Sequence, residues 1–139
     1  MGLYYRIWVD FIVRLRSKEI NKNNWKSKSL IFMTISMTFN LALLMSILQK
    51  HILSYYFYKL EIPFLSNYEN NIITILVLFI SPCFIVNYLL IFRGKRYEKL
   101  LERYPYCNGR LFVAYFSISM FLPIILMWIS IFLSEWKTL

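Results

Sequence analysis

Few side chains in this sequence are of the types that catalyse reactions or bind metals. The single histidine, His51, has only the isolated carboxylates Glu61 and Glu69 near it in the chain. A zinc-type site gathers three or four His, Cys, Asp or Glu ligands, so no metal centre is predicted. Cys83 and Cys107 lack the spacing of a metal-binding or redox pair, and we expect two free thiols. The sequence therefore predicts no catalytic residue, no metal and no cofactor.

One further group of charged side chains lies close to the N-terminus. Arg6, Asp10 and Arg14 recur every four residues and would form one narrow charged row on a helix. That spacing permits ion pairs along the helix, each worth about 0.2 to 0.5 kcal/mol. The rest of residues 2–17 is largely apolar and aromatic. We therefore predict a short amphipathic helix that lies in the membrane interface with its apolar face in the lipid. A docking helix for a partner protein is the alternative.

Three uncharged apolar runs dominate the chain and would carry or position all of these side chains. They cover approximately residues 29–49, 71–92 and 111–134, and a membrane-spanning helix needs about 20 apolar residues. The connections between them are too short to form a separate soluble domain of ordinary size. The sequence predicts an all-α integral membrane protein with three transmembrane helices, in which residues 1–139 form a single membrane domain.

The connection between the second and third runs shows another amphipathic pattern. Lys95, Lys99 and Arg103 recur every four residues, with aromatic and apolar side chains on another face. We expect a cytoplasmic amphipathic helix that binds anionic lipid headgroups. Docking of a protein is again the alternative, and the pattern leaves open whether this helix continues the second span. Aromatic residues expected to contact lipid or a partner at the membrane interface are Trp8, Phe11, Tyr55, Tyr56 and Tyr58.

Two residues near the middle of the membrane leave hydrogen-bonding groups that lipid cannot satisfy. Pro82 frees the carbonyl of Leu78, four residues earlier, and Asn40 carries an amide. Asn40 and Pro82 both lie about 15 to 17 Å from the cytoplasmic ends of their spans. We therefore expect Asn40 to donate to the Leu78 carbonyl; a bond within its own helix or to a second copy of the chain is the alternative. Asn87 lies shallower, at the expected depth of Thr34.

Lys and Arg are distributed very unevenly over the segments that flank the apolar runs. Thirteen of the 16 lie in residues 1–28 and 93–110. Because basic residues near span ends remain in the cytoplasm, the N-terminus and the second connection are expected inside and the C-terminus outside. A bacterial inner membrane is the expected location. The net charge of +9 is explained by these flanking positions, so no nucleic-acid partner is predicted.

The predicted layout of an interfacial helix followed by three spans is similar to that of bacterial diacylglycerol kinase. That resemblance would imply membrane-level acidic residues that hold Mg²⁺, but the three apolar runs contain no Asp or Glu. An enzyme is therefore not predicted. We expect a non-catalytic protein that contacts membrane lipids and another membrane protein or itself, as an accessory subunit of a membrane complex or an immunity protein against a membrane-targeting toxin. An oligomeric channel or a component of a small-solute transporter is the alternative, although such pathways usually carry ionisable residues.

Overall fold

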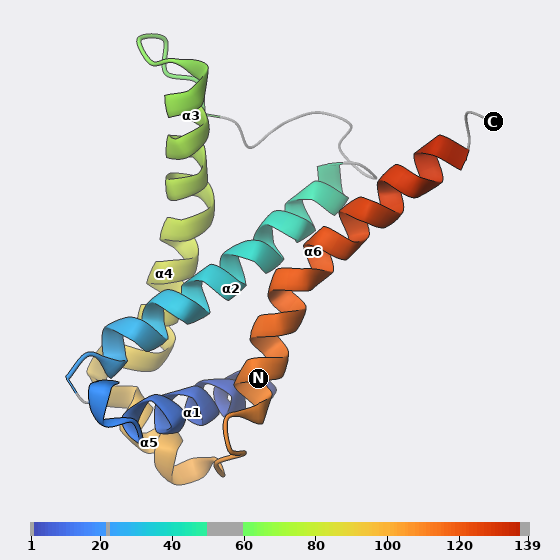
Figure 1. The fold of residues 1–139 in the computed structure, drawn as a ribbon. Helices are drawn as coiled ribbons and strands as arrows, with labels where there is room; N and C mark the ends of the chain where they lie inside the picture. The colour runs from blue at the N-terminus through green and yellow to red at the C-terminus, as the bar shows by residue number, and fades with distance from the viewer. Residues whose placement is uncertain (1, 22, 50–59, 137–139) are drawn as a thin grey trace.

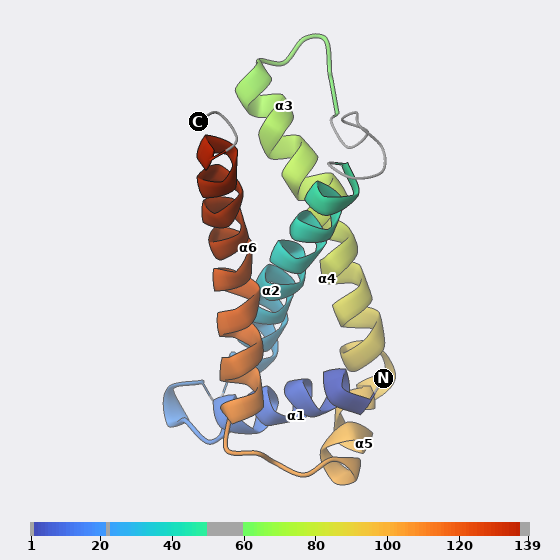
Figure 2. The same cartoon turned by 90° about the vertical axis from the view of Figure 1, so that its right-hand side faces the viewer.

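The chain forms a small bundle of helices. The computed structural model describes residues 2–21, 23–49 and 60–136, and the regular secondary structure in those ranges is entirely helical. Within them, three helical segments are long and apolar enough to cross a membrane, which confirms the predicted all-α class with three candidate spans. The three rise from a common base, and a shorter N-terminal helix lies across that base (Figure 1, Figure 2).

The N-terminal helix α1 (Gly2–Arg16) is followed by a single 3-10 turn, η1 (Glu19–Asn21), and then by the first candidate span, α2 (Trp25–Leu48). The Trp25 ring marks the start of α2 at the base of the bundle. The Arg16 guanidinium lies 5.4 Å and the Lys26 ammonium 5.6 Å from the centre of this ring. Such cation–π contacts hold both charges at the level where the span begins.

The second candidate span is one helical rod built from alternating α-helical and π-helical turns. Its successive parts are α3 (Asn67–Thr74), the π-helical η3 (Ile75–Ile80), α4 (Ser81–Asn87) and the π-helical η4 (Tyr88–Phe92). The rod starts earlier than the predicted residue 71 because Ser66 and Glu69 form a capping box, in which each side chain accepts the other residue's backbone N–H. This cap adds a polar turn that the apolar run does not include.

The π-helical turn η3 changes the hydrogen bonding around Pro82. In a π-helix each N–H bonds the carbonyl five residues earlier, and the N–H of Ser81 bonds the Leu76 carbonyl in this way. Pro82 follows directly, in the first turn of α4, and the helix continues through it.

The chain turns sharply at the end of the second span. Gly94 and Lys95, in the short turn η5 (Arg93–Lys95), have left-handed backbones with φ of 62° and 54°. Because of this turn, the amphipathic helix α5 (Arg96–Arg103) does not continue the second span. It lies at the base of the bundle near α1 (Figure 2).

The third candidate span, α6 (Arg110–Trp136), packs mainly against α2 and α1. Pro123 lies within this helix without ending it. Its buried side chains lie in the part nearest the base, at Phe112 and Ser119. From Phe121 to Ile129 every residue other than Pro123 is exposed. Residues 121–129 of α6 therefore present their surface to whatever surrounds the bundle.

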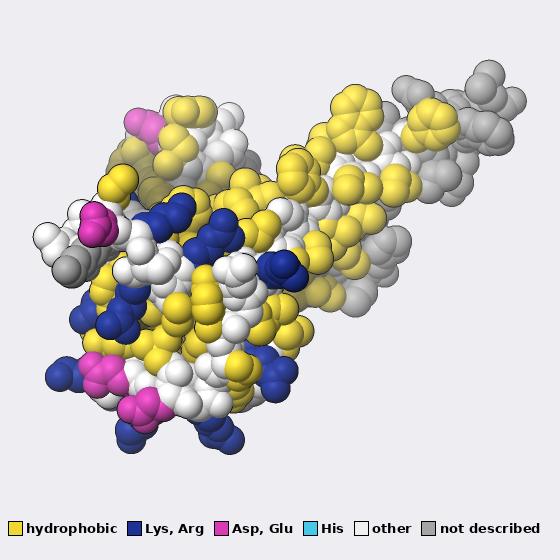
Figure 3. Space-filling model, turned by 60° about the horizontal axis from the view of Figure 1, so that its bottom comes forward, with side chains coloured by type: hydrophobic (Ala, Val, Ile, Leu, Met, Phe, Trp, Pro, Cys, Tyr) yellow, Lys and Arg dark blue, Asp and Glu magenta, His cyan; other side chains and the backbone are white. Residues whose placement is uncertain are grey.

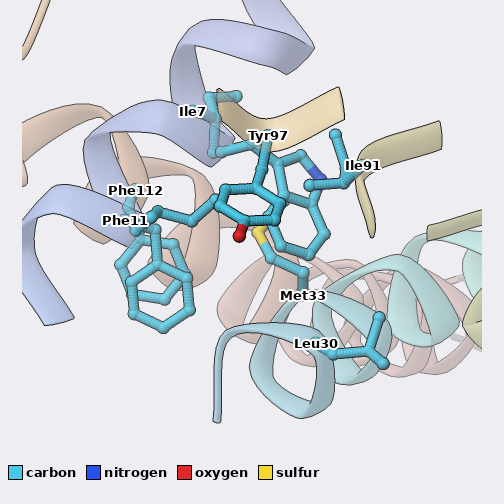
Figure 4. Close-up of a cluster of buried hydrophobic side chains, with 9 residues drawn as sticks. Ile7, Phe11, Leu30, Met33, Ile91, Tyr97 and Phe112 are labelled. Atoms are coloured by element: carbon cyan, nitrogen blue, oxygen red, sulfur yellow. The ribbon is translucent and has the colours of Figure 1, made fainter. Parts of the chain in front are cut away.

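The main hydrophobic core lies at the base, where α1 meets the ends of the three spans. Its buried members are Ile7, Trp8, Phe11, Ile12, Leu30, Met33, Ile91, Tyr97 and Phe112. The rings of Phe11 and Phe112 stack face to face, with centroids 3.4 Å apart (Figure 4). The expectation that α1 turns its apolar face to lipid is corrected by this packing. That face covers the chain's own helices, which offer it close aromatic contacts.

Candidate functional site

Two groups of polar side chains join helices that are far apart in the sequence, and the first surrounds Asp10. Asp10 is completely buried, and its carboxylate accepts four backbone N–H groups from the segment that leads into α6. Cys107 and Gly109 each donate to Oδ1 at 2.8 Å. Leu111 and Phe112 donate to Oδ2 at 2.9 and 3.3 Å. Asp10 thus caps the N-terminus of α6 from another helix, where two orphan N–H groups and the positive helix end both favour a carboxylate.

Gly109 and Arg14 complete the same hydrogen-bonded arrangement. Gly109 has a φ of +72°, which glycine adopts without strain. The Arg14 guanidinium donates to the Gly109 carbonyl at 3.3 Å. A Cβ atom at residue 109 would lie 2.3 Å from Cδ of Arg14, so the close approach of this side chain requires glycine. We call Asp10, Arg14, Gly109 and their mutual hydrogen bonds the basal brace.

The basal brace is suited to holding helices together rather than to chemistry. A carboxylate offers about four acceptor sites, and the four N–H donors occupy that capacity. Asp10 therefore has no lone pair left for a metal ion or for a substrate proton. The expected ion pairs along the row Arg6, Asp10 and Arg14 are replaced by bonds that join α1 to a segment about 100 residues further on.

The second polar region lies between the helices, and its inner part is centred on Asn87. This side chain is completely buried. Its Oδ1 accepts a hydrogen bond from the Tyr4 hydroxyl, and its Nδ2 donates to Thr34 Oγ1 at 3.4 Å. Burial raises the pKa of Tyr4 to about 12, so at neutral pH the hydroxyl keeps the proton that it donates. Asn87 in this way links α1, α2 and the second span, and it lies at the level of Thr34.

The outer part of this polar region is centred on Asn40. Its Nδ2 donates to the Tyr115 hydroxyl at 3.2 Å and to Ser119 Oγ at 3.0 Å, both on α6. The predicted partner was the Leu78 carbonyl beside Pro82 on the second span. The structure instead pairs Asn40 with the third span, where two hydroxyls lie one helical turn apart.

Loss of the Asn40 contact is expected to be measurable but modest. Asn40→Leu and Ser119→Ala should show a coupling of about 0.6 to 2 kcal/mol in a double-mutant cycle, because hydrogen bonds between membrane helices have about this strength. The measurement is the free energy of unfolding in detergent. Ser46→Ala serves as the matched control, since the exposed Ser46 hydroxyl bonds the Ala42 carbonyl of its own helix. Additive losses for Asn40 with Ser119 would contradict the contact, whereas Asn40 with Ser46 should be additive.

The residues predicted to contact lipid or a partner fall into three groups. Trp8 and Phe11 are buried in the core and are not available to either, which corrects that expectation. Lys95, Lys99 and Arg103 are exposed at the base, as that prediction requires. The remaining three, Tyr55, Tyr56 and Tyr58, lie outside the residues that the structure describes.

Sequence reasoning missed most of the partners in both polar regions. Tyr4, Tyr115 and Ser119 are each separated from their partners by more than 70 residues in the chain. The one local signal lies at Asp10, the only acidic residue in an otherwise apolar and basic helix. A lone carboxylate in such a segment, when its helix is buried, must find donors.

The base of the molecule is strongly basic. Figure 3 shows Lys and Arg side chains spread over this face, with apolar side chains covering the part that extends away from it. The exposed basic residues of the elements at this end include Arg6 and Arg16 of α1, Lys26 of α2, and Lys99 and Arg103 of α5.

In the described ranges, His, Cys, Asp and Glu nowhere form a group of three or more that could hold a metal ion. No protein family, curated protein or solved structure matches this chain.

Proposed function

We propose that this protein is a non-catalytic integral membrane protein that acts by contacting another membrane protein, as an accessory subunit of a complex or an immunity protein against a membrane-targeting toxin. The observation that carries the proposal is the contrast between the two ends of the bundle. The base is held together by the basal brace and the core, whereas residues 121–129 of α6 are almost all exposed. The exposed aromatic residues of α6 include Phe121 at 61%, Trp128 at 67% and Phe132 at 64%.

The inward direction of the polar side chains favours this proposal over an oligomeric pore. A pore made from several copies would need polar groups on an outward face of each copy. Asn87, Ser36 and Ser119 are buried between the helices, and the Asn40 amide is bonded to α6. These groups therefore serve contacts within the chain, and the outward surfaces of the spans are mainly apolar.

Copurification in a mild detergent tests the proposal. The tagged protein, expressed at its natural level, should bring down one membrane protein in a fixed ratio that mass spectrometry identifies. The variant Phe121→Ala with Trp128→Ala should recover much less of that partner, because hot-spot aromatic residues contribute about 2 kcal/mol or more each. Ile20→Ala is the control, since Ile20 is 92% exposed and lies outside the spans. A chain that purifies alone, or a partner yield unaffected by the α6 variant, would contradict the proposal.

The proposed orientation places the base in the cytoplasm of a bacterial cell. It is supported by the position of α1 and α5 at the same end of the bundle (Figure 1), since these elements lie in the two most basic segments of the chain. A reporter that is active only in the cytoplasm should work when inserted at Asn108 and should be silent when fused after Leu139. The reverse pattern would contradict this orientation.

A further inference from the structure

A pocket of about 330 Å³ lies between the start of α2 and the turn that precedes α5. Lys26, Ser27 and Leu30 line it from α2, Tyr88 and Phe92 from the end of the second span, Lys95 from the turn η5, and Tyr97 from α5. We call it the headgroup pocket. Its volume is at the lower end of the range of small-molecule sites in proteins.

The headgroup pocket is electrostatically suited to an anion. Lys26 and Lys95 both line it, and none of its described lining residues is acidic. The Lys26 ammonium lies 5.1 Å from the centre of the Tyr97 ring and also faces Trp25, so its position is restrained. Lys26 and Ser27 belong to the first turn of α2, where Asn24 makes no side-chain cap and the helix dipole adds positive potential.

Lys95 occupies its place in the pocket at a conformational cost. Its φ of 54° is in the left-handed region, which glycine adopts freely but most side chains avoid. Strain of this kind persists where the surrounding structure or a function requires it. Lys99 and Arg103 belong to the same sequence pattern as Lys95, but only Lys95 lines the pocket.

The headgroup pocket also has apolar and aromatic side chains in its lining, from Leu30 on α2 and from Tyr88 and Phe92 on the second span. Tyr88 is 48% exposed, so the lining reaches the outward surface of the second span there. Ile31 and Leu89, which follow Leu30 and Tyr88 in the chain, are exposed at 52% and 38%. A ligand that fits both parts has an anionic group at one end and a long apolar group at the other.

We infer that the headgroup pocket binds the phosphate of an anionic phospholipid, with Lys26 and Lys95 as its charged contacts and the acyl chains lying along α2 and η4. This goes beyond the proposed partner-binding function and does not depend on it. The pocket makes lipid binding local and selective, whereas the amphipathic pattern of α5 alone predicts only diffuse attraction to a negative surface.

Lipid retention by the full-length protein in detergent tests the inference. The protein is incubated with micelles that contain phosphatidylglycerol and phosphatidylcholine, and retained lipid is counted by native mass spectrometry. The variant Lys26→Gln with Lys95→Gly should retain about 25-fold less phosphatidylglycerol, since each basic residue beside an anionic headgroup contributes a factor of about five. Glycine suits the backbone of residue 95, so this variant is expected to fold. Its unfolding midpoint in detergent should match that of the unaltered protein.

The matched control is Lys99→Gln with Arg103→Gln, which removes the same charge from α5 outside the pocket. This control should lower the retention of phosphatidylglycerol by no more than about twofold. The variant Lys26→Arg, with Lys95 intact, keeps both charges and should retain as much phosphatidylglycerol as the unaltered protein. Equal losses in the two double variants would overturn the inference in favour of diffuse surface charge, and no loss in the pocket variant would overturn it outright. Inorganic phosphate that displaces the lipid or binds in its place would assign the pocket to free phosphate instead.

Discussion

Asp10→Ala is expected to lower the free energy of unfolding by about 3 to 5 kcal/mol, which is large for a helix that lies outside the spans. The change removes the acceptor of four backbone N–H groups, and the hydrogen bonds from two of them, Gly109 and Phe112, are buried. Each buried donor left without a partner costs about 1 to 3 kcal/mol. The loss is measured by unfolding in mixed detergent, and loosening of α1 by labelling a cysteine placed at Ile7.

Arg6→Ala is the matched control for this prediction. Arg6 lies one helical turn from Asp10 and is exposed, so its replacement should change stability by less than about 0.5 kcal/mol. Asp10→Asn should give an intermediate loss, because one oxygen can still accept from Cys107 and Gly109 while the amide nitrogen cannot accept at all. Equal effects of Asp10→Ala and Arg6→Ala would mean that Asp10 belongs to an ordinary surface charge row.

Trp8→Ala should also destabilise the protein by about 3 to 5 kcal/mol. Trp8 is completely buried, and its ring meets Phe92 edge to face at 5.7 Å. Truncation would leave a cavity between α1 and the ends of the spans. The same detergent unfolding measures the loss, and the emission of the remaining tryptophans would show whether the base has opened.

Leu3→Ala distinguishes the loss of packing around Trp8 from a simple loss of membrane affinity of α1. Leu3 lies on the same helix and is 66% exposed, so its removal should cost little. If α1 were held by lipid, both Leu3→Ala and Trp8→Ala would weaken the attachment of α1 to the bilayer. Neither substitution would then alter the unfolding of the spans. A small loss for Trp8→Ala in detergent would therefore contradict the packing described here.

The three spans could be predicted from the sequence because apolar run length is a direct consequence of bilayer thickness. Their ends were less predictable. The second span begins near Asn67 because Ser66 and Glu69 cap it, and a polar turn of this kind adds nothing to an apolar run. The separation of α5 from that span depends on Gly94 and Lys95, of which only the glycine suggested a turn.

The depth of the polar side chains in the membrane could be predicted from the sequence, but the neighbouring helix that each one faces could not. Distance along the helix places Asn40 near the middle of the membrane, yet the helix can be turned toward either neighbour. The apolar surface of α2 is too uniform to fix that rotation, and the observed contact is with Tyr115 and Ser119. The amphipathic pattern of α1 had the same ambiguity, since an apolar face can cover lipid or protein equally well.

The basal brace also determines the order in which the helices assemble during translation. The N–H groups that bind Asp10 belong to residues 97 to 102 positions later in the chain. During translation α1 leaves the ribosome long before these residues exist, so its buried carboxylate has no final partners while the first two spans enter the membrane. The base can close only once the nascent chain has delivered the start of α6. Assembly of this bundle therefore ends with its first helix, and a chain arrested before Gly109 would expose α1 to water, lipid or a chaperone.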